Sequence, residues 1–367
     1  MKKLFLALCA FSAMSLVACH KDDPQPTPQG GNDNPQQEEI PVGEGIYNPA
    51  VHISSIVYND GTPADIWIWE NRKLQSINNS DNCGGYTPVS MFNYDGWRLS
   101  QMTMSGDMPA VVNYTYVGNS LNSINISSGG MQMADIQLRH TGDMITHMDI
   151  DVNETMLQLL IDMLGEGGFD YGDDVFTSVL GRDLVRSMAR SAKAAYGEKL
   201  SVQSTQFAAD IIWDGYNVSR ILLSAQLELG ITGEELSQIM SFDSSMAIYA
   251  TLLNYVAGDQ ELPLDVTIND TMDYTYDDHA NPLKGFLGNL DVAALSSNNV
   301  TSSANHGSMN ADITITIPIL GDQHIPFGQS LGDGQTLVIT YTYNTAGYPA
   351  MTEDSDGKQT TYSYSEN

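Results

Sequence analysis

Cysteine is scarce in this chain, which has only 3 in 367 residues. Cys9 lies within the apolar run at the N-terminus and Cys19 follows it, which leaves Cys83 alone for the folded part. A single thiol cannot form an internal disulfide, so a buried core has to stabilise the fold. No His lies near Cys83 in the sequence to act as its base, which disfavours a catalytic thiol.

Basic residues are also few. The chain has 15 Lys and Arg against 45 Asp and Glu, a formal net charge of −30 at pH 7. Nucleic acid and anionic lipid both repel a surface of this sign. The composition therefore argues against a nucleic-acid partner, and any attachment to a membrane needs a cause other than charge.

Several motifs of catalysis are missing. The sequence has no His-Glu-x-x-His, no phosphate-binding loop and no dinucleotide-binding glycine pattern. These absences predict no cofactor and favour a non-enzymatic role. A hydrolase built on paired carboxylates or on a metal stays open, because only a structure shows which of the 45 acids lie together.

The N-terminus has the layout of a signal peptide. Met1-Lys2-Lys3 precedes an apolar run from Leu4 to Leu16 that is too short to span a membrane. Leu16-Val17-Ala18-Cys19 resembles the lipobox of bacterial lipoproteins, in which the Cys is acylated and becomes the mature N-terminus. The resemblance implies a signal peptide over residues 1–18 and a lipid on Cys19. The alternative is an ordinary secretory signal followed by a chance Cys.

Residues 19–45 are predicted to be a disordered tether. They are rich in Pro, Gln, Asn and Asp and hold too few apolar residues to offset the entropy of ordering. His20-Lys21-Asp22-Asp23 is similar to a tag that carries lipoproteins of one Gram-negative phylum to the cell surface. We therefore expect an outer-membrane, lipid-anchored, surface-exposed protein that contacts the membrane through its lipid alone.

A motif of alternating aromatic residues followed by a turn recurs along the rest of the chain. Aromatic–polar–aromatic puts both rings on one face of a strand, and Asn or Asp with Gly supplies the positive-φ residues of a hairpin. The copies are Phe92–Leu99, Val112–Asn119, Ile212–Tyr216, Tyr274–Leu283 and Tyr341–Tyr364. They predict a string of β-hairpins that share one aromatic layer.

These copies resemble the tyrosine-aspartate repeats of the Rhs family. They are also similar to a group of Gram-negative lipoproteins with a porin-like β fold. Only Tyr341–Tyr364 is close to the family spacing; the copy at Tyr94 is one residue short, and the copy at Tyr276 has Ala280 in place of Gly. Rhs proteins enclose a toxin with dozens of copies, so the resemblance implies an architecture here and not that activity.

The sequence thus predicts a single domain over residues 46–367, mainly β with α insertions. We expect a curved antiparallel sheet of hairpins, a half-barrel or open barrel-like form, with helices packed on one side. Capping residues and apolar spacing place the helical insertions near residues 153–197 and 232–257. The Ser- and Asn-rich stretch 291–310 is predicted to be a surface loop.

His147, Asp149 and Asp151 alternate on one predicted strand and are the best visible candidates for a metal site. A His with carboxylates can bind a divalent cation. The simpler interpretation is the wet face of an amphipathic strand, and we assign no metal, catalytic or cofactor-binding residue. Trp67 and Trp69 likewise form either a platform for a sugar ring or part of a packed layer, and we favour packing.

Arg182, Arg186, Arg190 and Lys193 share one face of a predicted helix. This face is either a docking stripe for an anionic partner or a solvated face that offsets nearby carboxylates. The leading function is a non-catalytic cell-surface lipoprotein that binds extracellular glycan or protein. The alternatives are a hydrolase with a carboxylate or metal site, and a structural component of an envelope complex.

Overall fold

The computed structural model describes most of the chain from residue 40 onward, and residues 41–367 form one compact unit. The described ranges are 40–80, 85–106, 109–153, 201–234, 258–259, 261–288, 290–317 and 321–365, with the single residues 237, 251 and 255.

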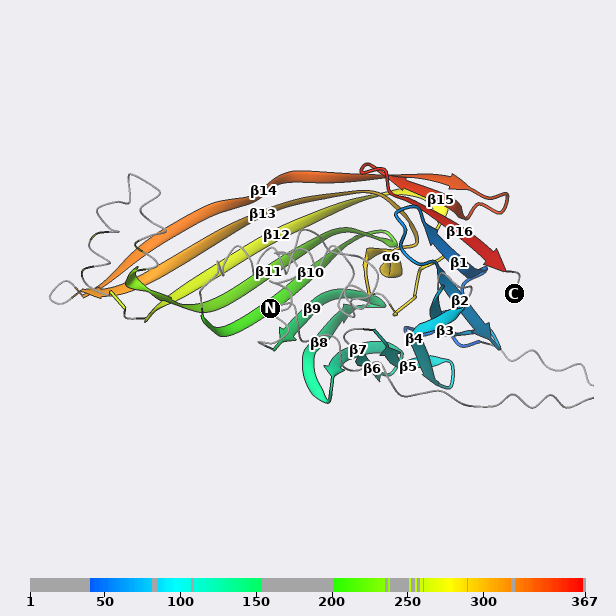
Figure 1. The fold of residues 1–367 in the computed structure, drawn as a ribbon, viewed down its shortest axis with the longest axis horizontal. Helices are drawn as coiled ribbons and strands as arrows, with labels where there is room; N and C mark the ends of the chain where they lie inside the picture. The colour runs from blue at the N-terminus through cyan, green and yellow to red at the C-terminus, as the bar shows by residue number, and fades with distance from the viewer. Residues whose placement is uncertain are drawn as a thin grey trace, which may run out of the picture. The chain divides into compact units, whose positions relative to one another are not determined.

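Sixteen antiparallel strands make up the described part (Figure 1). They are β1 (His52–Tyr58), β2 (Asp65–Glu70), β3 (Lys73–Ser80), β4 (Tyr86–Asp95), β5 (Arg98–Met104), β6 (Ala110–Val117), β7 (Ser120–Ser128), β8 (Met131–Thr141), β9 (Met144–Val152), β10 (Ser201–Asp214), β11 (Asn217–Thr232), β12 (Glu261–Ala280), β13 (Asn298–Ile317), β14 (Gly321–Tyr343), β15 (Pro349–Asp354) and β16 (Gln359–Ser365). Each strand pairs with the next along the chain, and β1 pairs with β16. The sheet is therefore a closed barrel.

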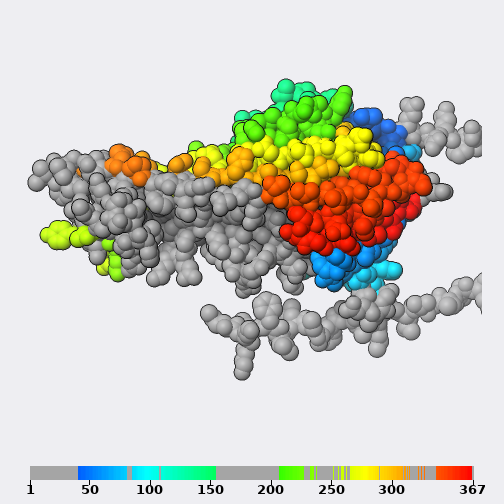
Figure 2. Space-filling view, turned by 90° about the horizontal axis from the view of Figure 1, so that it is seen from above, coloured from blue at the N-terminus to red at the C-terminus, as the bar shows by residue number. Residues whose placement is uncertain are grey.

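This closure shows that the predicted open half-barrel was wrong. Ile56 and Tyr362 face each other across the closing pair of strands, although they lie at opposite ends of the sequence. In Figure 2 the C-terminal residues (red) accordingly lie beside the N-terminal strands (blue). An open sheet would leave the backbone N–H and C=O groups of two edge strands unpaired, and closure pairs them.

The helices predicted on one side of the sheet are also not what the described residues show. Their one complete helix, α6 (Val292–Leu295), lies inside the ring of strands (Figure 1). Most of residues 153–197 and 232–257 lies outside the described part. No helix among the described residues has the length and hydropathy needed to cross a membrane. The predicted surface loop 291–310 was wrong as well, since β13 occupies most of it.

The repeated motif does form hairpins. The copies at Phe92–Leu99, Val112–Asn119 and Ile212–Tyr216 span the β4–β5, β6–β7 and β10–β11 turns, where Gly96, Gly118 and Gly215 each adopt a positive φ. The last copy spans the end of β14, all of β15 and most of β16, and these strands pair in sequence. The copy at Tyr274 differs, because no tight turn joins β12 to β13.

In every even-numbered strand except β8, an aromatic residue near the end of the strand bonds to the preceding strand and so ties neighbouring hairpins together. Its side-chain N–H or O–H donates to a backbone carbonyl at the start of the preceding odd-numbered strand, over 2.5–2.8 Å. The donor–acceptor pairs are Trp69–Ile53, Tyr94–Leu74, Tyr116–Leu99, Trp213–Ile145, Tyr276–Val218, Tyr341–Val300 and Tyr364–Pro349. Burial raises the pKa of the Tyr276 hydroxyl to about 12, so it remains a donor at neutral pH. These bonds tie successive hairpins together along one rim.

Where side chains are described, the inward residues of the wall are mostly apolar and most outward residues are polar, with Val57, Ile68 and Met91 among the exposed apolar exceptions. Ile124 and Ile126 of β7 are fully buried, as is Ile268 of β12. Thr267 and Asn269, which alternate with Ile268, are exposed. The period-2 pattern therefore places the hydrophobic core within the barrel.

Residues 281–288 and 290–297, between β12 and β13, fold into the barrel; we name them the inner loop. Its buried apolar residues are Phe286, Leu287, Leu290 and Ala294. The hydroxyl of Tyr47 donates to the Pro282 carbonyl at 2.8 Å, and that of Tyr114 to the Leu287 carbonyl at 2.9 Å. Side chains of distant segments thus fix the loop in place.

Candidate functional site

Two adjacent cavities lie in the lumen against the inner loop. Wall side chains can fill a barrel of about eight strands, but a sixteen-stranded barrel is wider and leaves central space. The inner loop occupies part of that space. Two cavities beside it that described residues line have volumes of about 410 and about 180 Å³, and Leu283, Asp291 and Tyr341 line both.

Aromatic rings dominate one side of the larger cavity. Phe286 of the inner loop lies 5.0 Å from the ring of Trp67 and 5.8 Å from the ring of Phe92, measured between centroids. Ile77 and Met102 extend this apolar wall. Flat rings that line a cavity are typical of sites that bind small organic molecules.

Trp67 differs from its neighbour Trp69 in the use of its indole N–H. Trp69 donates to the Ile53 carbonyl at 2.8 Å. Trp67 is only 5% exposed, and its Nε1 has no hydrogen-bond acceptor among the described residues. A buried donor left unsatisfied costs about 1–3 kcal/mol. Trp67 lines the larger cavity, but its Nε1 is enclosed by protein atoms and is not exposed to that space.

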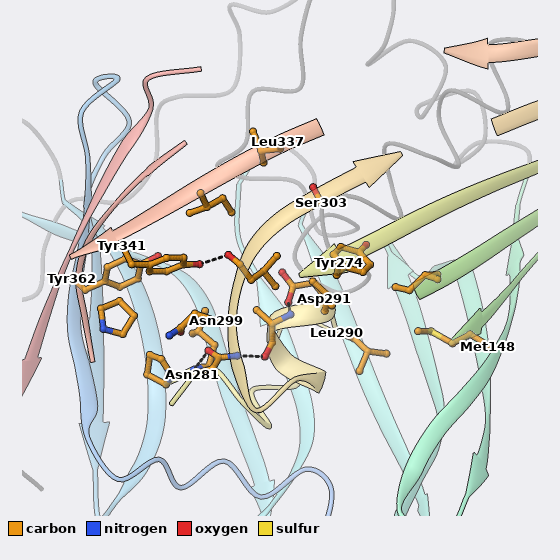
Figure 3. Close-up of a pocket in the computed structure, with 18 residues that line it drawn as sticks. Met148, Tyr274, Asn281, Leu290, Asp291, Asn299, Ser303, Leu337, Tyr341 and Tyr362 are labelled. Carbon is orange, nitrogen blue, oxygen red and sulfur yellow. Dashed lines mark hydrogen bonds between the residues drawn. The ribbon is translucent and has the colours of Figure 1, made fainter. Parts of the chain in front are cut away.

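The smaller cavity lies between the inner loop and the opposite wall (Figure 3). Tyr341 and Tyr362 are on one side of it, Met148 on the other, and Asp291 between them. Asp291 caps α6, since its Oδ1 accepts the backbone N–H of Ala293 at 2.7 Å. The inner loop therefore presents a carboxylate whose position the helix cap fixes.

The charged groups that line the larger cavity are mostly acidic. Asp65, Asp291 and Asp354 supply carboxylates, and Lys358 supplies an ammonium. The Tyr58 hydroxyl donates to Asp65 at 2.7 Å, and burial followed by the Asp65 charge raises the pKa of Tyr58. Lys358 pairs with a carboxylate outside the cavity, that of Asp60, at 2.7 Å. Among these groups, negative charge prevails.

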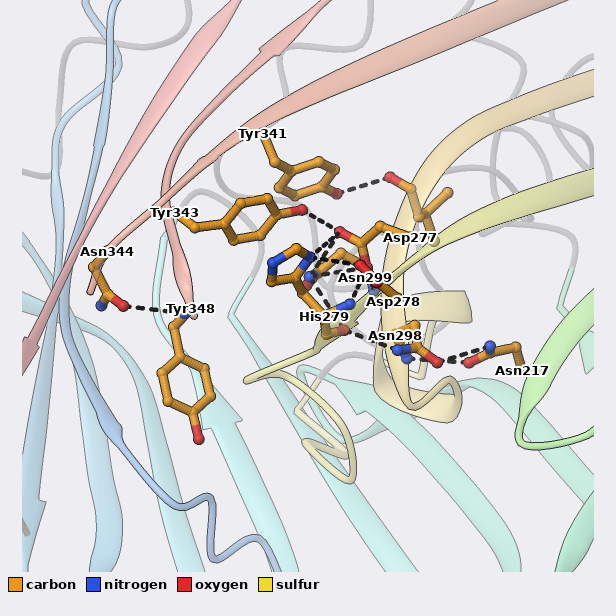
Figure 4. A network of polar contacts seen from close by, with 11 residues as sticks. Asn217, Asp277, Asp278, His279, Asn298, Asn299, Tyr341, Tyr343, Asn344 and Tyr348 are labelled. Carbon is orange, nitrogen blue, oxygen red and sulfur yellow. Dashed lines mark hydrogen bonds and ion pairs between the residues drawn. The ribbon is translucent and has the colours of Figure 1, made fainter. Parts of the chain in front are cut away.

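A second polar network joins the ends of β12, β13 and β14 (Figure 4). The Asp277 carboxylate accepts hydrogen bonds from the Tyr343 hydroxyl, the Asn299 side chain and the His279 backbone N–H. The His279 ring stacks on Tyr343 with centroids 3.8 Å apart and an interplanar angle of 8°. Burial, then the bond to Asp277, raises the pKa of Tyr343. The network has the features of a structural clamp at the rim.

The predicted group His147, Asp149 and Asp151 is only partly brought together. Nε2 of His147 lies 3.0 Å from Asp149, and its Nδ1 lies 2.5 Å from Asp210 of β10. Arg139 also pairs with Asp149. Desolvation lowers the pKa of His147, but its hydrogen bonds to Asp210 and Asp149 outweigh this and raise it. A carboxylate lies at each ring nitrogen, so both nitrogens are engaged in hydrogen bonds and neither is presented to a metal ion in this arrangement.

In the part of the chain that the structure describes, no three His, Cys, Asp or Glu are grouped to hold a metal. Cys19, Cys83 and the stripe from Arg182 to Lys193 lie outside that part. Packing of Trp67 and Trp69 is confirmed, with their rings stacked 6.4 Å apart. The segment Gly328–Gly332 has a Gly-x-Ser-x-Gly pattern that the sequence predictions missed, but it lies inside β14 and not at the strand-to-helix turn of a nucleophile elbow.

Comparisons with known proteins identify no family. No family model and no curated protein matches the sequence. Among solved structures, the chain is similar to a porin-like protein from Bacteroides uniformis ATCC 8492, with 8% sequence identity. The match covers 88% of this chain and 98% of that one, with a TM-score of 0.25. At that score no property of the porin-like protein is carried over to this chain.

Proposed function

We propose that this chain is a lipid-anchored, non-catalytic surface protein that binds a small, largely apolar molecule in the barrel lumen. The observation that supports it best is the cavity of about 410 Å³ between the aromatic wall and the inner loop. Its volume is within the range of about 300–1,000 Å³ typical of small-molecule sites.

The polar outer face supports attachment through a lipid. Membrane-spanning barrels carry an apolar band outside and a polar lumen. Here the described inward residues are mostly apolar, and on the outer face Asn93, Gln101 and Asn113 form a chain of side-chain hydrogen bonds across β4, β5 and β6, over 3.2 and 2.9 Å. A wall of this kind suits water, which leaves membrane attachment to the lipid expected on Cys19.

The aromatic rings point into the barrel, so we propose a ligand bound in the lumen and not one bound on the outer surface. A glycan or protein bound by exposed rings was the leading prediction from the sequence. The rings of Trp67, Tyr114 and Phe92 are buried instead. The hydrolase alternative loses its best candidate, because carboxylates occupy both nitrogens of His147.

A titration with N-phenyl-1-naphthylamine, an uncharged dye that fluoresces in apolar surroundings, tests the proposal. Thr360 lines the larger cavity, whereas Thr361, the next residue of β16, is exposed. We expect the wild-type chain and Thr361→Phe to bind the dye equally, and Thr360→Phe to bind it at least tenfold more weakly because its ring fills the lumen. Binding that is absent, or equal in all three chains, contradicts a lumenal site.

The same titration, run in competition with soluble oligosaccharides, separates glycan binding from binding of apolar molecules. Displacement by sugars but not by apolar compounds would contradict the proposed ligand. The anchor is tested separately by labelling cells with a fatty acid analogue. We expect the label on the wild-type chain and none on Cys19→Ser, and an equal label on both would contradict the assigned acylation site.

A further inference from the structure

The two lumenal cavities extend from the inner loop toward different parts of the barrel wall. The larger cavity reaches the first five strands, where Trp67 of β2 and Phe92 of β4 line it. The smaller cavity reaches the opposite wall, where Met148 of β9, Ile221 of β11 and Ser303 of β13 line it. Residues of the inner loop line both cavities, so the loop lies between these two parts of the wall.

The two cavities adjoin along the wall that β14 and β16 form. Six residues line both of them: Leu283, Asp291, Leu337, Ile339, Tyr341 and Tyr362. Tyr341 is held in place, because its hydroxyl donates to the Val300 carbonyl at 2.8 Å. Leu283 belongs to the inner loop, is only partly buried and has an aliphatic side chain. A ligand that passes Leu283 from one cavity into the other leaves the hydrogen bond of Tyr341 intact.

The linings of the two cavities differ in kind. The ring of Phe286 lies 5.0 Å from that of Trp67 and 5.8 Å from that of Phe92, so rings form one side of the larger cavity. Most residues that line the smaller cavity are aliphatic, Ile221 and Leu290 among them. A flat ring packs well against other rings, and a hydrocarbon chain packs well against aliphatic groups. The larger cavity therefore suits a ring and the smaller one suits a chain.

We infer that the two cavities are the lobes of one site, which takes an apolar molecule made of an aromatic ring and a hydrocarbon chain. The ring lies in the larger lobe against Trp67, Phe92 and Phe286, and the chain passes Leu283 into the smaller lobe. This inference rests on the proposed function, since it names the ligand class of the same lumen.

A series of phenols from 4-methylphenol to 4-hexylphenol, used to displace N-phenyl-1-naphthylamine, tests the inference. All of them are uncharged at pH 7, because a phenol has a pKa near 10. Burial of one methylene strengthens binding about fourfold. With the wild-type chain we therefore expect the inhibition constant of 4-hexylphenol to be at least a hundredfold lower than that of 4-methylphenol.

The matched variants are Ser303→Phe and Ser302→Phe. Ser303 lines the smaller cavity alone, and Ser302, the preceding residue of β13, lines neither. Inhibition constants are corrected for the affinity of each variant for the dye. In Ser303→Phe the new ring fills the smaller lobe, so 4-methylphenol should bind as in wild type while the advantage of 4-hexylphenol falls below about tenfold. Ser302→Phe should keep the full advantage.

Ile221→Phe narrows the same lobe from β11 and should reproduce the result of Ser303→Phe. It also serves as the test if Ser303→Phe does not fold. The inference is wrong if chain length has no effect in the wild-type chain, or if both lobe-filling variants keep the full advantage. It is also wrong if Ser302→Phe loses the advantage to the same extent. In these cases binding of the dye in the lumen survives, whereas a dye that does not bind at all contradicts the proposed function itself.

Discussion

Glu44 lies beside His140, with Nε2 of the imidazole 3.0 Å from Oε2 of the carboxylate. His140 occupies the penultimate position of β8, where most even-numbered strands carry an aromatic donor. By the pattern of the other strands, the side chain at this position would donate to the Leu121 carbonyl at the start of β7. Here the carboxylate of Glu44 joins the two strands instead. It accepts the Leu121 backbone N–H and contacts the His140 imidazole. The segment that leads into the barrel therefore completes its rim.

Replacement of Glu44 by Ala should destabilise the barrel. It removes the acceptor of the Leu121 N–H and the partner of His140, with an expected loss of about 1–3 kcal/mol in the free energy of unfolding. Urea unfolding of the variant measures this. Glu70→Ala, a matched change at an exposed position, should cost less than about 0.5 kcal/mol. Equal effects of the two changes would show that Glu44 does not complete the rim.

Gly45→Ala should be more harmful than Gly96→Ala. Both glycines have a positive φ, +78° and +58°, so both substitutions strain the backbone by about 1 kcal/mol. Only at Gly45 would the new Cβ also overlap the Tyr116 side chain, whereas it meets open space at Gly96. The midpoint temperature of thermal unfolding should therefore fall further for Gly45→Ala than for Gly96→Ala. An equal fall would mean that the segment around Gly45 does not pack on Tyr116.

The His147 cluster should stabilise the fold more at low pH than at high pH. The pKa of His147 is raised in the folded state, so its stabilisation is complete below the ordinary value near 6.5 and is lost as pH rises through the higher folded value. The unfolding free energy of wild type minus His147→Gln should be larger at pH 5.5 than at pH 9. The difference should be at most about 1 kcal/mol, because the partners are largely exposed.

Asp151→Asn is the control for this measurement. Asp151 is exposed and does not contact His147, so the variant should keep the pH dependence of the wild-type chain. Loss of that dependence in Asp151→Asn, or its survival in His147→Gln, would contradict the cluster of His147 with Asp149 and Asp210.

Barrel closure can be tested with a disulfide between β1 and β16. Val57 and Thr361 are directly paired and both exposed. Directly paired residues have Cα atoms about 4.5–5.5 Å apart, within disulfide range. In a Cys83→Ser background, Val57→Cys/Thr361→Cys should cross-link readily and raise stability by about 2–4 kcal/mol. Val57→Cys/Thr340→Cys places the second thiol on β14, three strands away, and should not cross-link. Failure of the first pair would indicate an open sheet.

Local signals explain which parts of the fold were predictable. The pair Asp95-Gly96 and the alternation of Phe92 and Tyr94 predict a hairpin, because turn conformation and strand faces depend on adjacent residues. The pairing of β1 with β16 depends on the number and curvature of all the strands, which no local pattern records. The lumen was not predictable for the same reason. Alternation of apolar and polar residues shows that a strand has two different faces, but it does not show which face the barrel encloses.

For the candidate site residues too, local relationships were predictable from the sequence and long-range ones were not. His147 and Asp149 share a face as their spacing predicted, whereas Asp210 joins them from β10 and was not foreseen. Phe286 and Asp291 gave no signal, because a non-repetitive connection becomes an inner loop only through contacts such as that between Tyr47 and Pro282. The unused donor of Trp67 is visible only when every neighbouring acceptor has been placed.

A crystal structure of the chain grown with N-phenyl-1-naphthylamine tests the claim of a lumenal binding site most directly. The predicted result is the aromatic rings of the dye inside the barrel, against Phe286 and Phe92. A lumen without the compound, or the compound bound only on the outer face of the strands, would contradict it.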